Sequence, residues 1–256
     1  MNTTSTRPRV LVLSARGTNR DLELAAAFEL VGADAEIRLV TQLRRDEGDW
    51  SGYQLVAVPG GFSHGDALGA GRLLGLDLAT WFGDRLRGHI ERGRPVIGIC
   101  NGFQALVRAG FLPGGPAGGC EEPAVLTHNE SGRFECRWVD LLPEPISPWT
   151  ASLDGPLRCP VAHGEGRWVG PVDRVALRYA EPKGNGPAGG AYPANPNGSI
   201  DDVAGVVDAT GLVLGLMPHP EDHVLARHDP HRRRGSARQG SCLPLFEAGV
   251  AHAAHT

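Results

Sequence analysis

The stretch Val96-Ile97-Gly98-Ile99-Cys100-Asn101-Gly102-Phe103-Gln104 joins a short apolar run to a segment that reads as the start of a helix. This pattern predicts a buried strand that turns directly into a helix. Cys100 stands at the turn, and a tight strand-to-helix elbow lifts such a side chain off the sheet edge as an exposed nucleophile. Gly98 and Gly102 supply the small residues that a crowded turn requires. The adjacent helix N-terminus would favour the thiolate of Cys100 over its thiol.

Three further apolar runs precede this elbow, and two segments with helical apolar spacing alternate with the runs. Strands without polar alternation are typical of a parallel sheet that helices cover on both faces. The runs lie at residues 10–13, 37–40 and 55–58, and the helical segments at 22–31 and 73–92. After Gly110, short segments between Pro/Gly-rich turns predict an antiparallel extension of the sheet. They lie at 137–142, 175–179, 203–207 and 213–216, and a closing helix is expected at 243–253.

The expected fold is therefore α/β, with a mostly parallel central sheet, helices on both faces and an antiparallel extension. We expect residues 1–256 to form a single domain, because no internal repeat or clear linker divides them. A net charge of −4 gives no field for binding nucleic acid or an anionic membrane. Five cysteines without a C-x-x-C pair argue against a disulfide framework and a zinc cluster. With no secretory signal or membrane span, we expect a cytoplasmic protein.

A thiolate nucleophile needs a base or ion-pair partner and a group that orients that partner. The segment Leu216-Met217-Pro218-His219-Pro220-Glu221 supplies a candidate pair late in the chain. Residues two apart in extended backbone point to the same side, and Pro220 biases His219 toward an extended conformation. We therefore expect His219 to face Cys100 while Glu221 holds the imidazole.

Attack on an amide carbonyl creates an oxyanion, which prearranged backbone N–H groups stabilise. Pro59-Gly60-Gly61-Phe62 follows a predicted parallel strand, at the end where α/β sheets place their ligands. The N–H of Gly61 is one expected donor. The N–H of Asn101, the residue after the nucleophile, is the other.

Three competing motifs suggest other chemistry. Gly69-Ala70-Gly71 with Gly75 resembles a dinucleotide loop, but its last spacing is wrong and no strand runs directly into it. Four histidines could form a metal site, although Pro220 prevents a regular helix from presenting the first two; they are His219, His223, His228 and His231. Arg232-Arg233-Arg234 is interpreted as a solvated loop.

The same residues resemble the class I glutamine amidotransferases, and among them the glutaminase subunits of phosphoribosylformylglycinamidine synthase. The matching segments occur in the family's order and span most of the chain. They are Pro59-Gly60-Gly61-Phe62-Ser63-His64-Gly65-Asp66, Gly98-Ile99-Cys100-Asn101-Gly102-Phe103-Gln104, Asn129-Glu130-Ser131-Gly132-Arg133-Phe134-Glu135, Val161-Ala162-His163-Gly164-Glu165-Gly166, Asn195-Pro196-Asn197-Gly198-Ser199 and Met217-Pro218-His219-Pro220-Glu221.

The resemblance implies a flavodoxin-like, three-layer fold and a Cys100, His219 and Glu221 triad. It implies glutamine hydrolysis through a glutamyl thioester, an oxyanion hole at Gly61 and Asn101, and no cofactor or metal in this subunit. The ammonia would pass to a large synthetase subunit that uses ATP and Mg²⁺ to convert formylglycinamide ribonucleotide to its amidine. A small third subunit is also implied. Residues expected around bound glutamine are Gly60, Phe62, Gln104, Asn129 and Phe134.

The sequence departs from the family pattern at a few positions. His64 stands where Tyr is usual, and Asp222 where Arg is usual. An early Gly-Ser-Asn-Cys-Asp motif appears as Gly17-Thr18-Asn19-Arg20-Asp21. None of these changes removes a triad member. Two alternatives stay open: an amidotransferase for another acceptor pathway, and an inactive relative that serves as a scaffold.

Overall fold

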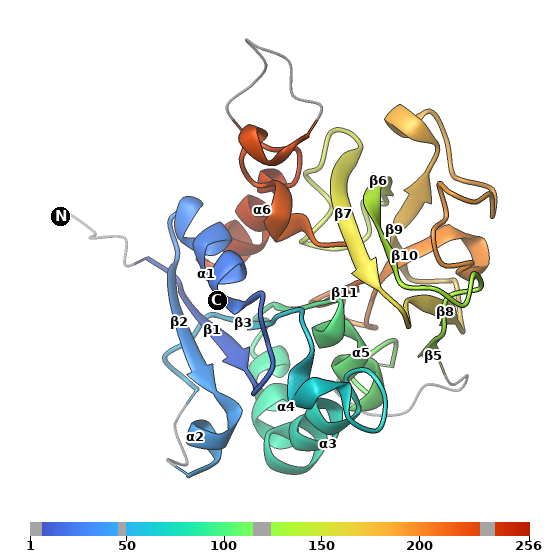
Figure 1. Cartoon of the computed structure of the whole chain (residues 1–256). Coiled ribbons are helices and arrows are strands. Elements are labelled where there is room, and N and C mark those ends of the chain that lie inside the picture. Colours follow the sequence, from blue (N-terminus) through green and yellow to red (C-terminus); the bar gives the residue numbers. More distant parts are fainter. Residues whose placement is uncertain (1–6, 46–49, 115–123, 231–238) are drawn as a thin grey trace, which may run out of the picture.

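The computed structural model describes residues 7–45, 50–114, 124–230 and 239–256, and a nine-stranded mixed sheet is its largest element (Figure 1). The strand order is β2-β1-β3-β4-β11-β10-β9-β6-β7. The first five strands are parallel, and the last four add antiparallel pairs. The parallel strands are β1 (Arg9–Ser14), β2 (Asp34–Leu39), β3 (Leu55–Val58), β4 (Val96–Ile99) and β11 (Val213–Leu216).

The antiparallel part differs from the sequence-based expectation at two strands. Residues 213–216 were expected in the antiparallel extension, but β11 runs parallel to β4 and pairs antiparallel only with β10. All four of its residues are buried, as in a strand covered on both faces. Strand β7 was not predicted, and it contains Pro160. The antiparallel strands are β10 (Val203–Val207), β9 (Val175–Ala180), β6 (Glu135–Pro143) and β7 (Leu157–His163); β5 (Val125–Thr127) and β8 (Arg167–Val169) form a small second sheet.

Helices cover both faces of the parallel strands, which agrees with the expected three layers. α1 (Asp21–Leu30) and α6 (Leu243–Ala253) lie on one face, and α3, α4 and α5 on the other (Figure 1). The helical stretch expected over 73–92 is interrupted at Phe82, whose φ of −125° ends one helix before the next begins. The remaining helices are α2 (Val40–Arg45), α3 (Arg72–Trp81), α4 (Gly83–Glu91), α5 (Asn101–Arg108) and the 3₁₀ turns η1 (Ser63–Asp66), η2 (Pro182–Gly184), η3 (Ile200–Asp202), η4 (Pro220–His223) and η5 (Ala226–His228).

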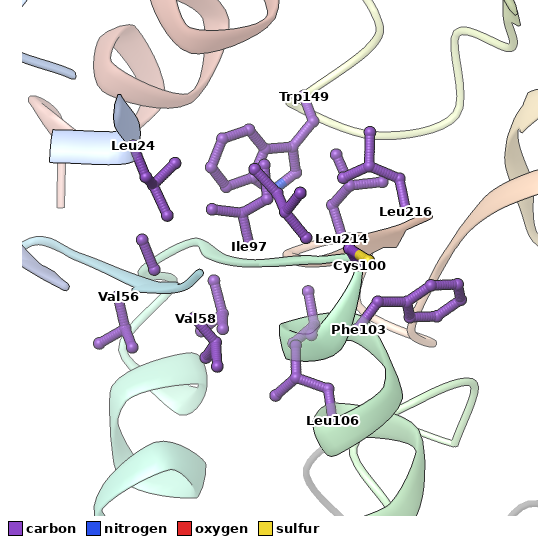
Figure 2. Packing of buried hydrophobic residues seen from close by; sticks show 14 of the residues in the cluster. Leu24, Val56, Val58, Ile97, Cys100, Phe103, Leu106, Trp149, Leu214 and Leu216 are labelled. Carbon is purple, nitrogen blue, oxygen red and sulfur yellow. The ribbon is translucent and has the colours of Figure 1, made fainter. Parts of the chain in front are cut away.

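The hydrophobic core extends over both faces of the central strands. Figure 2 shows Leu24 and Trp149 on one side of these strands, and Phe103 and Leu106 on the other. Trp149 is fully buried, and its indole N–H donates to the Leu212 carbonyl at 2.9 Å. Burying large apolar side chains on both faces supplies most of the free energy that holds such a sheet in place.

The glycines at 69–75 allow two helices to pack closely. A β-carbon at Gly71 would lie 2.8 Å from the backbone nitrogen of Ala105, and one at Gly75 would lie 3.0 Å from the Ala105 carbonyl oxygen. Helices approach this closely only where side chains are missing from the contact. The residues that resemble a dinucleotide loop therefore let α3 pack against α5.

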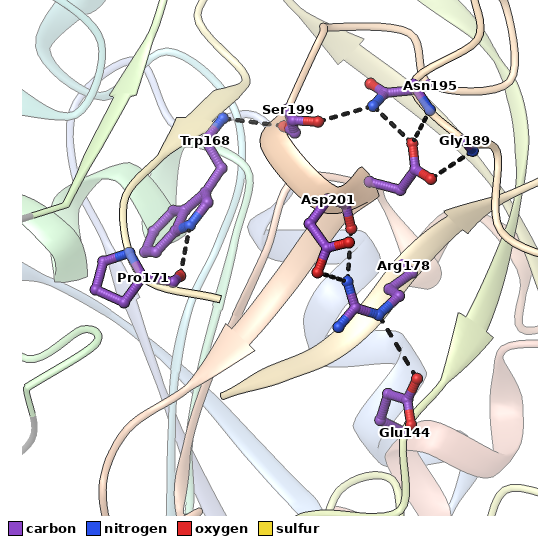
Figure 3. A network of polar contacts seen from close by, with 10 residues as sticks. Glu144, Trp168, Pro171, Arg178, Gly189, Asn195, Ser199 and Asp201 are labelled. Atoms are coloured by element: carbon purple, nitrogen blue, oxygen red, sulfur yellow. Dashed lines mark hydrogen bonds and ion pairs between the residues drawn. The ribbon is translucent and has the colours of Figure 1, made fainter. Parts of the chain in front are cut away.

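The Asn-Pro-Asn-Gly-Ser segment holds a long loop against the small sheet (Figure 3). Asn195 Nδ2 donates to the Ser199 carbonyl and to Asp202 Oδ1, both at 2.9 Å. Ser199 Oγ accepts the backbone N–H of Trp168 at 2.9 Å. Because each of these polar groups is buried, losing one partner would leave the other unsatisfied. This motif therefore has a structural role, because its hydrogen bonds attach the loop to the small sheet.

Acid is expected to destabilise the fold through His89, which is buried in α4. Burial lowers the pKa of His89 from 6.5 to about 4, although its Nε2–H donates to the Pro95 carbonyl at 3.4 Å. Its folded-state pKa is depressed, so its contribution to stability is complete above pH 6.5 and is lost as the pH falls toward 4. That loss amounts to about 3 kcal/mol.

The matched variant is His89→Gln, which keeps an N–H donor for Pro95 but does not titrate. Denaturant unfolding between pH 7 and pH 4 should give a shallower fall in the free energy of unfolding for the variant than for the wild type. Parallel profiles for the two proteins would show that His89 is not the group responsible.

Candidate active site

Cys100 occupies the elbow between β4 and α5 in a backbone conformation that side chains rarely adopt. Its φ is 50° and its ψ −106°, and Asn101 is the first residue of α5. Such a conformation costs about 1–3 kcal/mol and persists only where the surrounding structure enforces it. Gly102 shows that constraint, because a β-carbon there would lie 2.0 Å from the Val58 carbonyl oxygen. The elbow is pressed against the end of β3, and Cys100 Sγ lies 3.8 Å from the Ala162 carbonyl oxygen.

His219 and Glu221 follow β11, the strand beside β4, and Glu221 lies in the 3₁₀ turn η4. His219 Nδ1 is 2.7 Å from Glu221 Oε1, and the two side chains are only 4% and 0% exposed. The His219 backbone N–H donates to the Pro160 carbonyl at 2.8 Å, which attaches this segment to β7. The imidazole and the cysteine both lie against Gly60. A β-carbon at Gly60 would lie 2.6 Å from His219 Cε1 and 3.4 Å from Cys100 Cβ.

The charge state of His219 follows from its two neighbours. Burial by itself lowers the pKa of His219, but the negative charges of Glu221 and Cys100 outweigh it and raise the pKa well above its usual 6.5. The imidazolium form is therefore favoured at neutral pH. An imidazolium beside a cysteine is an arrangement that can stabilise a thiolate nucleophile.

The two expected oxyanion donors belong to residues near Cys100: Asn101 follows it in the chain, and Gly61 lines the same cavity. Asn101 is the first residue of α5, where a helix has no internal acceptor for the backbone N–H. Gly61 has a φ of 120°, and a β-carbon on it would lie 2.6 Å from the backbone nitrogen of Asn19. Another residue type would thus be strained at position 61 and would collide with that loop.

The side chain of Asn101 has a structural task that the sequence did not indicate. Its Oδ1 accepts hydrogen bonds from the backbone N–H and the hydroxyl of Ser63. Its Nδ2 donates to Asp66 Oδ1 at 2.8 Å and to Gln104 Oε1 at 3.2 Å. These bonds join η1 to the first turn of α5, so the loop that carries Gly61 is held beside the elbow.

A cavity of about 160 Å³ opens beside Cys100. Five of the residues expected at the site line it: Gly61, Phe62, Cys100, Gln104 and Phe134. Sequence reasoning had assigned no role to the rest of the lining. The sequence feature that could have indicated some of these residues is the His-Gly-Glu-Gly motif at 163–166, which matched the family but was assigned no function. The additional lining residues are Asp66, Ala70, Ala162, His163, Gly164 and Glu165.

Asn129 lies outside the lining of this cavity and supports its wall. Its Nδ2 donates to the carbonyls of Arg133 and His163, at 2.9 and 2.7 Å. Its Oδ1 is thereby an acceptor, and it receives the Gly166 N–H at 3.0 Å and His163 Nδ1–H at 3.1 Å. Burial and the charge of His219 lower the pKa of His163 to about 3, so His163 is neutral at physiological pH. Gln104 also contacts this wall, through its Nε2 and the Glu165 carbonyl at 2.6 Å.

The described residues contain no group of three or more His, Cys, Asp or Glu side chains arranged to hold a metal ion. His223, one of the histidines considered for such a site, instead lies within hydrogen-bond distance of the Arg158 carbonyl and the Ser241 hydroxyl. His231, Arg232-Arg233-Arg234 and Cys120 lie outside the described residues. The described cysteines are free thiols, and they are Cys100, Cys136, Cys159 and Cys242. Over the described ranges, no helix is long and apolar enough to cross a bilayer.

Comparison with known proteins identifies the family. The profile of the CobB/CobQ-like glutamine amidotransferase domain matches residues 7–253. The chain is 43% identical to phosphoribosylformylglycinamidine synthase subunit PurQ of Treponema denticola, over 95% of this chain and 98% of the relative. It is 40% identical to the same subunit of Dehalococcoides mccartyi, over 94% and 96%. A chain in the structure of PurLQS from Thermotoga maritima superposes with a TM-score of 0.75 and 30% identity, covering 96% of this chain and 99% of that one.

The fold, the cysteine elbow and the profile match define the class: the chain is a glutamine amidotransferase. Within that class it belongs to the PurQ family of phosphoribosylformylglycinamidine synthase subunits, which it matches over nearly its whole length.

Proposed function

We propose that this protein hydrolyses glutamine with a Cys100, His219 and Glu221 triad and supplies the ammonia to a synthetase. The observation that carries the proposal is the convergence of Cys100 and the His219–Glu221 pair at Gly60, beside a cavity of about 160 Å³. The ends of three neighbouring parallel strands bring these groups together. A nucleophile, a base and an orienting carboxylate in one site are the minimum for acyl transfer through cysteine.

In the first half of the reaction, the thiolate of Cys100 attacks the side-chain amide carbon of glutamine. The carbonyl oxygen becomes an oxyanion, and the backbone N–H groups of Gly61 and Asn101 stabilise it. When the C–N bond breaks, His219 donates its proton to the leaving nitrogen, and ammonia departs from a glutamyl thioester. Glu221 holds the imidazole in the orientation that this transfer requires.

In the second half of the reaction, water hydrolyses the thioester. Neutral His219 accepts a proton from the water as its oxygen attacks the thioester carbon, and glutamate leaves as the C–S bond breaks. The Cys100 thiolate and the His219 imidazolium are then restored. Neither half requires a cofactor or a metal from this chain. Phe62, Gln104 and Phe134 line the cavity, where we propose that they contact glutamine.

The acceptor reaction is proposed from the relatives. The curated relatives are named as subunits of phosphoribosylformylglycinamidine synthase, and the similar solved structure is titled as PurLQS. We propose that this chain docks to a large synthetase subunit and a small third subunit. The ammonia would there convert formylglycinamide ribonucleotide to formylglycinamidine ribonucleotide, with ATP and Mg²⁺ bound by the synthetase.

A glutamine analogue that carries an electrophilic carbon in place of the amide tests the proposal. Mass spectrometry of digested protein should place the label on Cys100, and excess glutamine should slow the labelling. Cys136 is an exposed thiol that serves as an internal control, because a generic alkylating agent should reach it. Label on Cys136 in place of Cys100, or labelling that glutamine does not slow, would refute the assignment.

A further inference from the structure

The loop of residues 15–20 packs directly against the loop that carries the proposed oxyanion donor. Thr18 forms an antiparallel bridge with Gly61, and the Phe62 N–H donates to the Gly17 carbonyl at 3.2 Å. The contact is close, since a β-carbon at Gly17 would lie 2.2 Å from the Phe62 carbonyl oxygen. The position of Gly61 therefore depends on the position of this loop.

The end of the same loop reaches the other side of the site. Arg20 Nε lies 3.8 Å from Asp222 Oδ2, and Asp222 directly follows the triad residue Glu221. The Asp222 backbone N–H donates to the His219 carbonyl at 3.3 Å. The side chains of Arg20 and Asp222 are 38% and 22% exposed, so water screens the pair only in part. One loop thus contacts the oxyanion donor at one end and the triad segment at the other.

The negative charge of two neighbouring carboxylates explains why a cation is needed beside Asp222. Glu221 is buried, and its Oε2 has no hydrogen-bond partner among the described residues. Asp222 places a second carboxylate beside it. Burial and the charge of Glu221 raise the pKa of Asp222, whereas His219 and Arg20 lower it. Arg20, which also lies 3.2 Å from Glu23, is the guanidinium that offsets this negative charge from the solvent side.

We infer that Arg20 is a positioning residue. Its ion pair with Asp222 fixes the position of the loop that carries Gly61 relative to the His219–Glu221 segment. Both Arg20 and Asp222 are positions where the sequence departs from the family pattern, and the ion pair joins the two departures. The inference rests on the proposed function, because it assigns Arg20 a role in the same reaction. Arg20 itself is not among the residues that line the cavity.

A charge-swap series tests this inference. The variants are Arg20→Asp, Asp222→Arg and the double variant that carries both, each measured for glutaminase kcat and KM in complex with the synthetase. Each single change places like charges together and should lower kcat by about 10-fold while KM stays within about 2-fold, because misplaced groups lose stabilisation of the transition state. The double variant restores an opposite-charge pair and should return kcat to within about 3-fold of wild type.

A matched control uses Arg87 and Asp84, an ion pair of 2.7 Å on α4. The exchange of those two charges should leave kcat unchanged. The labelling rate of Cys100 by the electrophilic analogue is measured in the free chain for every variant, and it should fall in both single variants and recover in the double variant. This readout separates positioning from partner contact, because no synthetase is present.

The outcomes distinguish a failure of the positioning role from a failure of the proposed function. Unchanged labelling of the free single variants, or a double variant no faster than either single one, would overturn the positioning role. A decrease in kcat of the complex without slower labelling of the free chain would also overturn it and would assign Asp222 to the docking surface. If the wild-type chain were not labelled at Cys100, the proposed function itself would fail.

Discussion

Replacing Cys100 with alanine should abolish glutamine-driven product formation and leave ammonia-driven formation within about 2-fold of wild type in the assembled enzyme. Loss of the nucleophile removes the thioester route, and a decrease of at least about 10⁴-fold is typical when a catalytic nucleophile is deleted. The side chain is small and 5% exposed, so alanine should preserve the fold. The measurement is amidine formation with either glutamine or ammonium chloride as the nitrogen source.

The comparison between nitrogen sources is decisive for the division of labour. Cys136→Ala, at an exposed thiol, is the control and should behave as wild type with both nitrogen sources. If Cys100→Ala also lost the ammonia-driven reaction while remaining folded and bound to its partner, this chain would do more than supply ammonia. If it kept the glutamine-driven reaction, Cys100 would not be the nucleophile.

Replacing Glu221 with glutamine should lower glutaminase kcat by about 10⁴-fold near pH 8, by analogy with the loss of other orienting carboxylates. Glu221 is the strongest influence that raises the pKa of His219 against the effect of burial. Without that charge the pKa of His219 falls, so the imidazolium is lost at a lower pH. In the wild type, the rate should persist as the pH rises above 7, whereas in the variant it should decline at a lower pH.

The pH profile distinguishes an electrostatic role from a packing role. Glu144→Gln is a suitable control, because this carboxylate is 45% exposed and lies 3.6 Å from Arg178, away from the cavity lining. It should keep the wild-type profile. A Glu221→Gln variant with reduced kcat but an unshifted alkaline limit would show that Glu221 does not control the protonation of His219.

The supporting residues around the site were beyond sequence reasoning for a physical reason. Asn129 was expected beside glutamine, yet the structure uses both ends of its amide to hold the His163 to Gly166 wall. Asn101 was expected to act through its backbone, and its side chain also joins η1 to α5. A polar residue type predicts that hydrogen bonds will form, but it does not identify the distant partner.

The Cys100 elbow and the parallel strands β1 and β3 were readable from local pattern, whereas β2 begins at Asp34, before the run predicted at 37–40, and Val40 already begins α2. An apolar run that ends at a small-residue turn has few other conformations available, and Pro220 restricts His219 locally. The pairing of His219 and Glu221 was also predicted from their closeness in the chain, but the structure forms it through the 3₁₀ turn η4 and not through the extended backbone that the sequence predicted. These features depend on interactions over a few residues, which a sequence displays directly.

Only the tertiary structure decided which distant segments meet. It placed β11 beside β4, brought Ala162 and His163 to the Cys100 cavity, and paired Arg20 with Asp222. Each of these contacts joins residues that are tens to hundreds of positions apart. Their geometry is set by how buried surfaces pack across the whole sheet, and that packing is a collective property which no short stretch of residues specifies.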